Sequence, residues 1–161
     1  FIEALETISK KYPATLISNK VDSIVLVLKG EIDFNMETIY TNEFESPHYF
    51  FLVIRDISIN LPETQSTISK FNKQNYKLDS LVIINLLLTK DLQLLKVEDF
   101  KNKTEALIYY ESIQESNITK GGLSNKQITP FIISKNNFSQ LLTEKNINKY
   151  KAYFNTIYLL N

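Results

Sequence analysis

The chain has 161 residues, and 18 lysines and arginines balance 18 aspartates and glutamates, so its formal net charge at pH 7 is zero. Apolar residues make up 43% and charged residues 22%, which is typical of a globular domain. The neutral balance argues against nucleic acid as the main partner, because phosphate binding requires an excess of basic side chains. The absence of cysteine excludes disulfides, thiolate metal sites and thiol nucleophiles.

The sequence predicts two short helices at the N-terminus. In residues 1–11 the apolar side chains recur on one helical face, namely Phe1, Ala4, Leu5 and Ile8. Tyr12 and Pro13 then end the helix, because proline cannot continue the hydrogen-bond ladder. The apolar stripe of the second helix consists of Leu16, Ile17, Val21, Ile24, Val25 and Leu28, with Gly30 placed as its C-terminal cap. Two such helices cannot bury both faces alone, which is typical of the last unit of a helical repeat array. Ala4, Ile8, Tyr12 and Pro13 resemble the second helix of a bacterial tetratricopeptide repeat, so residues 1–30 are expected to be the terminal hairpin of such an array, with an ordinary helical hairpin as the alternative.

Residues 31–45 are polar and aromatic without a sustained period, and we expect a linker there. From residue 46 the pattern changes to strands and helices in alternation. We expect strands at residues 48–54, 81–88, 92–97 and 129–134, and helices that begin after Asn60, Asn102 and Asn136 and near Ile147. The helix after Asn102 is expected to turn Ala106, Leu107, Tyr110 and Ile113 inward. A tight turn at residues 89–91 joins the second and third strands into a hairpin, and residues 117–127 form a loop.

The order of these elements predicts an α+β domain over residues 46–161 with the ferredoxin-like split βαβ plan (βαββαβ), an antiparallel sheet and two C-terminal helices. In this plan the first strand lies in the middle of the sheet and the second lies at an edge. Both faces of the first two strands are apolar, so both faces of the sheet need cover. We expect the C-terminal helices and the N-terminal hairpin to provide it, with a partner protein as the other candidate.

The sequence offers no convincing catalytic, cofactor-binding or metal-binding site. His48 is the only histidine, and a lone histidine at the start of a strand is expected to be structural. The carboxylates Asp56, Glu98 and Asp99 fall at strand ends beside lysines, which indicates a solvated rim rather than an acid/base pair. Three glycines cannot build a phosphate loop. We therefore expect a protein that is not an enzyme and carries no cofactor.

Four stretches taken in order carry a family resemblance: residues 46–54 (SPHYFFLVI), 68–72 (ISKFN), 97–113 and 131–138. They are similar to the C-terminal region of the tetratricopeptide-repeat lipoproteins of Bacteroidota called PorW or SprE, which are associated with type IX secretion and gliding motility. The resemblance implies a periplasmic, outer-membrane-associated scaffold anchored by a lipid upstream of this fragment. It implies protein partners, linking the outer-membrane translocon to periplasmic ring components, and no enzymatic activity.

Two other readings use the same fold plan. Residues 94–106 followed by residues 130–133 also resemble the second half of a SPOR domain, which binds glycan strands of peptidoglycan. In that case the aromatic residues 49–51 would form the sugar platform, although Glu98 and Asp99 stand where the third strand usually carries a glycine. A small-molecule regulatory domain of the ACT type is the third possibility.

The candidate contact surface for a partner is the exposed edge of the second strand. An unpaired edge presents free N–H and C=O groups, which invite pairing with a strand of another chain. The residues expected at this surface are Leu81, Ile83, Asn85 and Leu87.

Overall fold

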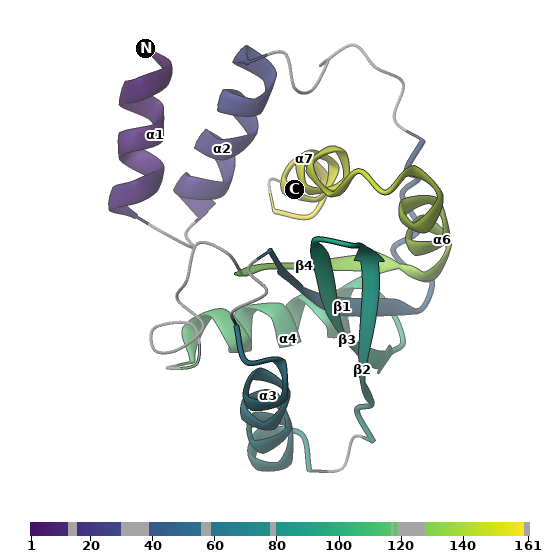
Figure 1. Cartoon of the computed structure of the whole chain (residues 1–161). Coiled ribbons are helices and arrows are strands. Elements are labelled where there is room, and N and C mark those ends of the chain that lie inside the picture. Colours follow the sequence, from purple (N-terminus) through teal and green to yellow (C-terminus); the bar gives the residue numbers. More distant parts are fainter. Residues whose placement is uncertain are drawn as a thin grey trace. The chain divides into compact units, whose positions relative to one another are not determined.

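The computed structural model describes residues 1–12, 16–29, 39–55, 59–77, 80–116, 118 and 128–159. The chain divides into two compact units, one comprising Phe1–Asn42 and Thr143–Asn161 and the other Glu43–Leu142. The architecture is α+β, with one four-stranded antiparallel sheet in the second unit (Figure 1).

The described part of the first unit contains the helices α1 (Ile2–Lys11), α2 (Leu16–Leu28) and α7 (Ile147–Ile157). Polar contacts join α1 to α2, since the ammonium of Lys29 lies 2.6 Å from Glu6 and the hydroxyl of Ser9 donates to Asp22 over 2.5 Å. Asp22 also pairs with Lys151 of α7 over 3.5 Å. The structure therefore groups the C-terminal helix with the N-terminal hairpin, whereas the sequence ranges placed it with the sheet.

The apolar residues of the hairpin are only partly buried. On α2, Val21 and Val25 are each 7% exposed. The other described residues of the expected α2 stripe are exposed to solvent: Ile17 is 56%, Ile24 47% and Leu28 47% exposed. Two residues of the expected α1 face are exposed as well, Phe1 at 88% and Ile8 at 39%. No residue of α1 is buried. Its face toward α2 includes Glu6 and Ser9, whose polar contacts with α2 override the apolar face expected from the sequence.

Tyrosines form the centre of the first unit. The ring of Tyr40 lies 4.8 Å from that of Tyr150 and 5.4 Å from that of Tyr153. The hydroxyl of Tyr153 donates to the carbonyl oxygen of Thr41 over 2.7 Å. Residues 40–41, which the sequence assigned to a linker, thus pack against α7, while Gly30 and residues 31–38 of that linker region lie outside the described residues.

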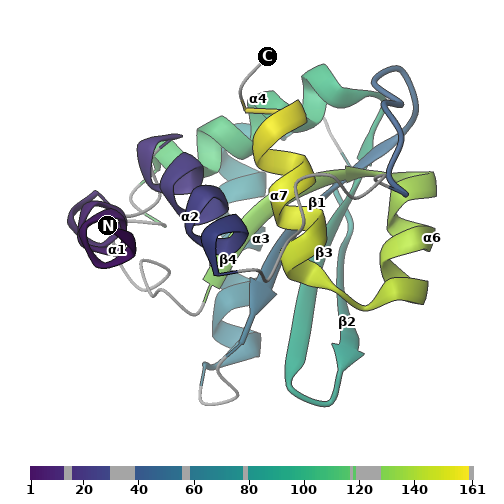
Figure 2. The ribbon, with the colours of Figure 1, turned by 90° about the horizontal axis from the view of Figure 1, so that it is seen from above.

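The sheet of the second unit consists of β1 (His48–Ile54), β2 (Ile83–Thr89), β3 (Leu92–Phe100) and β4 (Ile128–Ser134). The strands lie in the order β2-β3-β1-β4, which can be followed in Figure 2. This order confirms that the first strand is internal and that the second lies at an edge. The register places Phe51 of β1 opposite Lys96 of β3 and opposite Phe131 of β4.

In the described part of the second unit, helices α3 (Leu61–Asn75), α4 (Lys103–Glu115) and α6 (Lys135–Glu144) accompany the sheet, following β1, β3 and β4 respectively. Asparagine caps begin α3 and α4 as predicted, because Asn60 accepts from the backbone N–H of Glu63 and Asn102 from that of Glu105, each over 3.1 Å. The helix α6 is present as predicted, but Asn136 is not its cap. β4 runs directly into this helix, so the hydroxyl of Ser134 accepts from the N–H of Asn137 over 3.3 Å in place of an Asn136 cap.

Four strand boundaries differ from the prediction, and two of them, the end of β2 and the start of β4, differ by a single residue. β2 begins at Ile83 rather than at residue 81, and β3 extends to Phe100 rather than ending at residue 97. The extra residues of β3 pair with the start of β1, where Phe100 lies opposite His48. Tertiary pairing therefore extends β3 through a polar stretch that local propensity leaves outside a strand.

Helices cover both faces of the sheet, with α3 and α4 on one side (Figure 1). On that side the ring of Phe50 lies 5.0 Å from that of Tyr109 on α4. On the other side the ring of Phe51 lies 5.0 Å from that of Phe138 on α6. Phe50, Phe51 and Tyr109 are fully buried. On the second face of the sheet, α6 thus provides part of the cover that the sequence predicts. It is one of the two C-terminal helices expected there.

Candidate functional site

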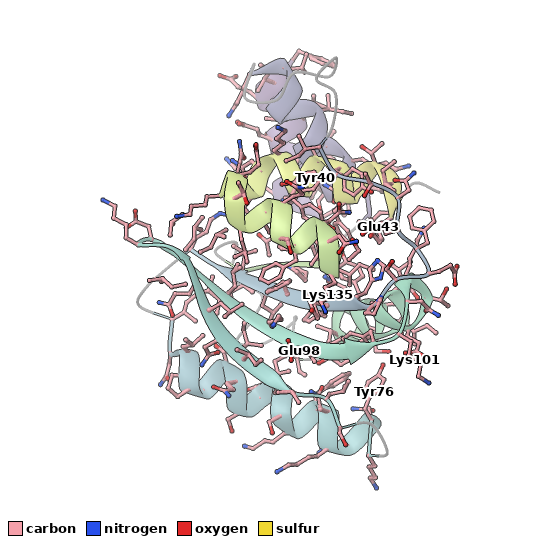
Figure 3. All side chains as sticks on the ribbon, turned by 90° about the vertical axis from the view of Figure 1, so that its right-hand side faces the viewer. Tyr40, Glu43, Tyr76, Glu98, Lys101 and Lys135 are labelled. Atoms are coloured by element: carbon pink, nitrogen blue, oxygen red, sulfur yellow. The ribbon has the colours of Figure 1, made fainter. Side chains whose placement is uncertain are left out.

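The outer edge of β2 is the candidate interaction surface. In the part of the chain that the structure describes, β2 pairs only with β3. Its sequence, IINLLLT, contains neither a charged residue nor a proline, the features that usually protect a free edge. The strand and α3 beneath it are visible in Figure 3. The edge therefore keeps free backbone groups beside apolar side chains.

The side chains of this edge are partly open to solvent. Leu87 is 67% exposed, and Val82, just before the strand, is 46% exposed. Asn85 is exposed as well and donates to Gln65 of α3 over 3.0 Å. Ile83 is half-buried. Three of the four residues expected at this edge, namely Ile83, Asn85 and Leu87, therefore lie in β2.

Leu81, the fourth expected residue, lies before the strand and is half-buried. Ile83, Asn85 and Leu87 alternate along β2, so they share the face of the sheet that α3 covers. The chain remains attached to β3 before the strand starts, because the N–H of Glu98 donates to the carbonyl oxygen of Val82 over 3.0 Å. The edge surface thus extends from residue 82 to residue 89.

The opposite edge of the sheet is different in composition. β4 forms that edge and carries Pro130, which lies opposite Leu52. Proline lacks an N–H group and is a common means of blocking a sheet edge. The contrast between the two edges makes β2, rather than β4, the edge that is open to strand addition.

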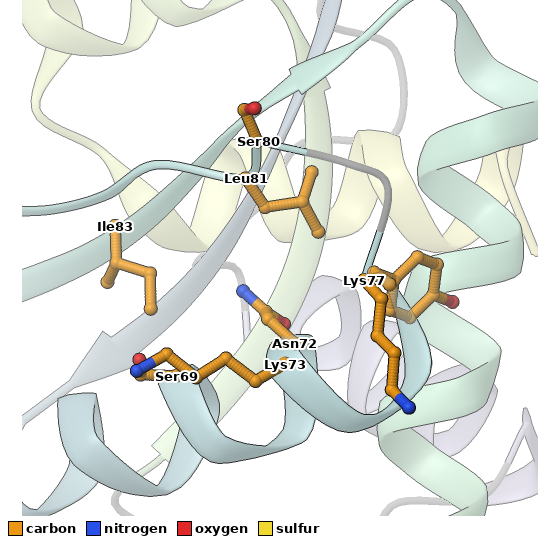
Figure 4. Close-up of a pocket in the computed structure, with 8 residues that line it drawn as sticks. Ser69, Asn72, Lys73, Lys77, Ser80, Leu81 and Ile83 are labelled. Carbon is orange, nitrogen blue, oxygen red and sulfur yellow. The ribbon is translucent and has the colours of Figure 1, made fainter.

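A pocket of about 240 Å³ lies between α3 and the start of β2. Its lining residues are Ser69, Asn72, Lys73, Tyr76, Lys77, Ser80, Leu81 and Ile83. Figure 4 shows the side chain of Asn72 rising from α3 toward residues 80–83. This pocket was not predicted from the sequence, although two of its lining residues, Leu81 and Ile83, were expected as edge residues. An asparagine inside an amphipathic helix gives no signal of a site, because only the tertiary structure places it under β2.

Asn72 is the polar centre of the pocket wall. It is 6% exposed, and its Oδ1 accepts from the hydroxyl of Tyr109 over 2.7 Å. Within the part of the chain that the structure describes, its Nδ2 has no hydrogen-bond partner. Burial raises the pKa of Tyr109 well above its usual value, so the hydroxyl remains a donor over the physiological range.

Of the three carboxylates expected on a solvated rim at the strand ends, only Glu98 has a described side chain. Glu98, labelled in Figure 3, pairs with Lys96 of the same strand. Lys96 is 8% exposed, and its ammonium lies 4.7 Å from the ring centre of Tyr49. Asp56 and the side chain of Asp99 lie outside the described residues. Glu98 is therefore one partner of a shielded ion pair rather than part of a fully solvated rim.

His48 is fully buried at the start of β1. Its Nδ1 lies 2.7 Å from the carbonyl oxygen of Ser46, which makes Nδ1 the protonated nitrogen of the neutral ring. Burial lowers the pKa of His48 below its usual value, against the smaller opposing effect of this hydrogen bond. These contacts are consistent with a structural role.

The aromatic residues of β1 lie in the core. Phe50 and Phe51 are fully buried. Tyr49 is half-buried, with Lys96 on its ring and Phe138 5.7 Å away. Stacking of sugars or bases requires an accessible aromatic face. β1 does not present such a face.

The described residues show neither a metal site nor a membrane-spanning helix. They contain no group of three or more metal-ligating side chains that could hold an ion. None of their helices combines the length and the apolar character needed to cross a membrane. No protein family, curated protein or solved structure matches the chain.

Proposed function

We propose that this chain is a non-enzymatic protein-interaction domain that pairs with a strand of its partner at the β2 edge. The second unit is then a ferredoxin-like split βαβ domain used as a docking module. The observation that carries the proposal is the unprotected, uncharged β2 edge beside exposed Leu87 and Val82. In strand addition, backbone hydrogen bonds provide affinity and alternate side chains provide specificity.

The N-terminal hairpin fits the same role as the end of a tetratricopeptide-like array over residues 1–30. Its exposed apolar side chains include Phe1, Ile8 and Ile17. In a helical array such side chains are buried by the neighbouring repeat, because each unit contacts mainly the units beside it. The hairpin would thus connect the array to the docking module.

The proposed setting is the cell envelope of a bacterium with type IX secretion or gliding motility. This part of the proposal is supported by the resemblance of residues 46–54 and 97–113 to the PorW and SprE lipoproteins. The chain would then be periplasmic and held at the outer membrane by a lipid anchor upstream. Its partners would be subunits of the outer-membrane translocon and of the periplasmic ring.

The glycan-binding alternative, a SPOR-like domain, required the aromatics of β1 as a platform. Because Phe50 and Phe51 are fully buried, a glycan would need a different surface. The structure offers no observation that favours this alternative, and it remains as an outcome of the experiment below.

The experiment is capture of partners by the full-length tagged protein from gently solubilised envelopes, with mass spectrometry of the eluate. Leu87→Lys adds a charge to the edge at a residue that is 67% exposed. Leu142→Lys is the matched control, because Leu142 is 43% exposed and lies on α6. We expect translocon or ring subunits with the parent protein and the control, and their loss with Leu87→Lys.

Equal capture by both variants would refute the β2 edge as the docking surface. Recovery of muropeptides without any secretion subunit would refute the scaffold role and favour glycan binding. Circular dichroism of each variant excludes unfolding as the cause of a loss.

A further inference from the structure

The pocket beneath β2 contains a buried hydrogen-bond donor that has no partner among the described residues. Asn72 is 6% exposed, and its Nδ2 finds no acceptor there, although its Oδ1 accepts from the hydroxyl of Tyr109. Leaving such a buried donor unsatisfied costs roughly the desolvation energy of the group, so native proteins rarely do so without a reason. Figure 4 shows this amide directed toward residues 80–83, across the pocket. The nitrogen thus marks the place where an acceptor atom is missing.

The other described lining residues indicate the chemistry of that acceptor. They include two lysines, Lys73 and Lys77, and no carboxylate. Both lysines are exposed, and neither has an ion-pair partner among the described residues. Their positive charge attracts an anion to the mouth of the pocket. An anionic oxygen also forms a stronger hydrogen bond with the Asn72 amide than a neutral oxygen does.

The remaining wall limits the size and polarity of the ligand. Tyr76, Leu81 and Ile83 provide mainly apolar surface, and the hydroxyl of Tyr76 is engaged with Ser112 over 3.1 Å. The volume of about 240 Å³ is below the roughly 300–1,000 Å³ of pockets for drug-sized molecules. The apolar wall and the small volume therefore suit a ligand whose apolar group is about the size of one aliphatic side chain. A singly charged head group also costs less to desolvate than a phosphate with two charges.

We propose that this pocket binds a carboxylate carried on a short aliphatic group, with one carboxylate oxygen accepting from Nδ2 of Asn72. The exposed side chains of Lys73 and Lys77 move aside at the mouth and then pair with the bound anion. The ligand is either a free small carboxylate or the C-terminal residue of a polypeptide, since both present the same chemical group. The inference does not depend on the proposed role of the β2 edge, although both use Leu81 and Ile83.

The test is a titration of the ¹⁵N-labelled chain with N-acetyl-leucine, followed by NMR. N-acetyl-leucinamide is the matched control ligand, because it has the same aliphatic group and no carboxylate. We expect the side-chain amide signals of Asn72 to shift with the acid, and the amide to bind about tenfold more weakly or not at all. Equal binding of the two compounds, or no shift of the Asn72 signals at millimolar acid, would overturn the proposal.

Variants of the lining residues test the assignment further. Asn72→Asp keeps an acceptor for Tyr109 but removes the donor, and we expect it to abolish binding of the acid. Since this buried variant can also fail to fold, the double variant Lys73→Gln, Lys77→Gln provides a second test at exposed positions. We expect it to weaken binding about fivefold, as loss of exposed charge pairs does. Lys70→Gln, an exposed charge change on α3 outside the pocket lining, should leave binding unchanged.

The sources of the carboxylate are distinguished by a second titration. A pentapeptide that ends in leucine is compared with the same peptide bearing a C-terminal amide. Tighter binding of the free-acid peptide than of N-acetyl-leucine, with added shifts along β2, identifies a polypeptide C-terminus as the ligand. Equal affinity of peptide and N-acetyl-leucine identifies a small carboxylate. If an ordered water on Nδ2 of Asn72 persists when the acid is added, neither source of the carboxylate is the ligand.

Discussion

The register of β2 determines which residues of the edge a partner can contact. The adjacent residues Leu87 and Leu88 provide a test of this register. Leu88 is 4% exposed, whereas Leu87 is 67% exposed. A slip of one residue would exchange these environments, because successive side chains of a strand point to opposite faces. Truncation of each leucine to alanine should therefore have very different effects on the free energy of unfolding.

The magnitudes follow from burial. Leucine to alanine removes about three carbon groups, and at about 0.8 kcal/mol for each the transfer loss at Leu88 is about 2.4 kcal/mol. The cavity left behind adds to this, so we expect Leu88→Ala to lower the free energy of unfolding by about 2.5–4 kcal/mol. Leu87 is about one-third buried, and its transfer loss shrinks to about 0.8 kcal/mol. Leu87→Lys should cost still less, since lysine keeps an apolar stem at this position.

The assay is urea unfolding followed by circular dichroism, with the slope of the transition compared between variants. Equal slopes allow the midpoints to be read as stability changes. If Leu87→Ala cost as much as Leu88→Ala, or more, the register of β2 and the exposed edge derived from it would be incorrect. The expected stability of Leu87→Lys is also what makes this variant usable in the binding experiment.

Three further predictions concern the core and the caps. Burial lowers the pKa of His48 below its usual value of 6.5, so as the pH falls the unfolded chain takes up a proton before the folded chain does. The free energy of unfolding should therefore be highest above about pH 6.5 and should fall as the pH drops from there toward the lowered pKa. This fall should be smaller in His48→Gln, as urea unfolding at about pH 7 and about pH 5.5 would show. Tyr109→Phe removes the donor to Asn72 and should cost about 1–3 kcal/mol in urea unfolding at pH 7; a cost near zero would contradict the buried hydrogen bond. Asn102→Ala should cost about 1 kcal/mol through loss of the α4 cap, whereas Asn102→Asp should restore most of it.

Local chemistry made much of the second unit predictable. The aromatic and β-branched run at β1 predicts a strand, and the asparagines at 60 and 102 mark helix starts through side-chain hydrogen bonds that require only a few neighbouring residues. The element order then gave the internal position of β1 and the edge position of β2, both of which the sheet order confirms. Each of these features depends on interactions that are short in sequence or fixed by connection order.

Most of the features that escaped prediction involve residues distant in sequence. Tyr109, rather than Leu107, is buried on α4 and donates to Asn72 on α3, although the i, i+3, i+4, i+7 spacing from Ala106 already favours Tyr109. α7 lies in the same unit as α2, and its Lys151 pairs with Asp22, far away in the chain. The pocket at Asn72 arises only where α3 meets the start of β2. Helical periodicity in the sequence does not predict which residues of different elements come into contact.

The central claim is that a partner strand binds at the β2 edge, and the most direct measurement is site-specific photo-crosslinking in cells. A photoreactive residue replaces Leu87 in the full-length protein, and in a second strain it replaces Leu142 on α6. The account predicts a crosslink from position 87 to a translocon or ring subunit, and none from position 142. A secretion subunit crosslinked from position 142 but not from position 87 would contradict it.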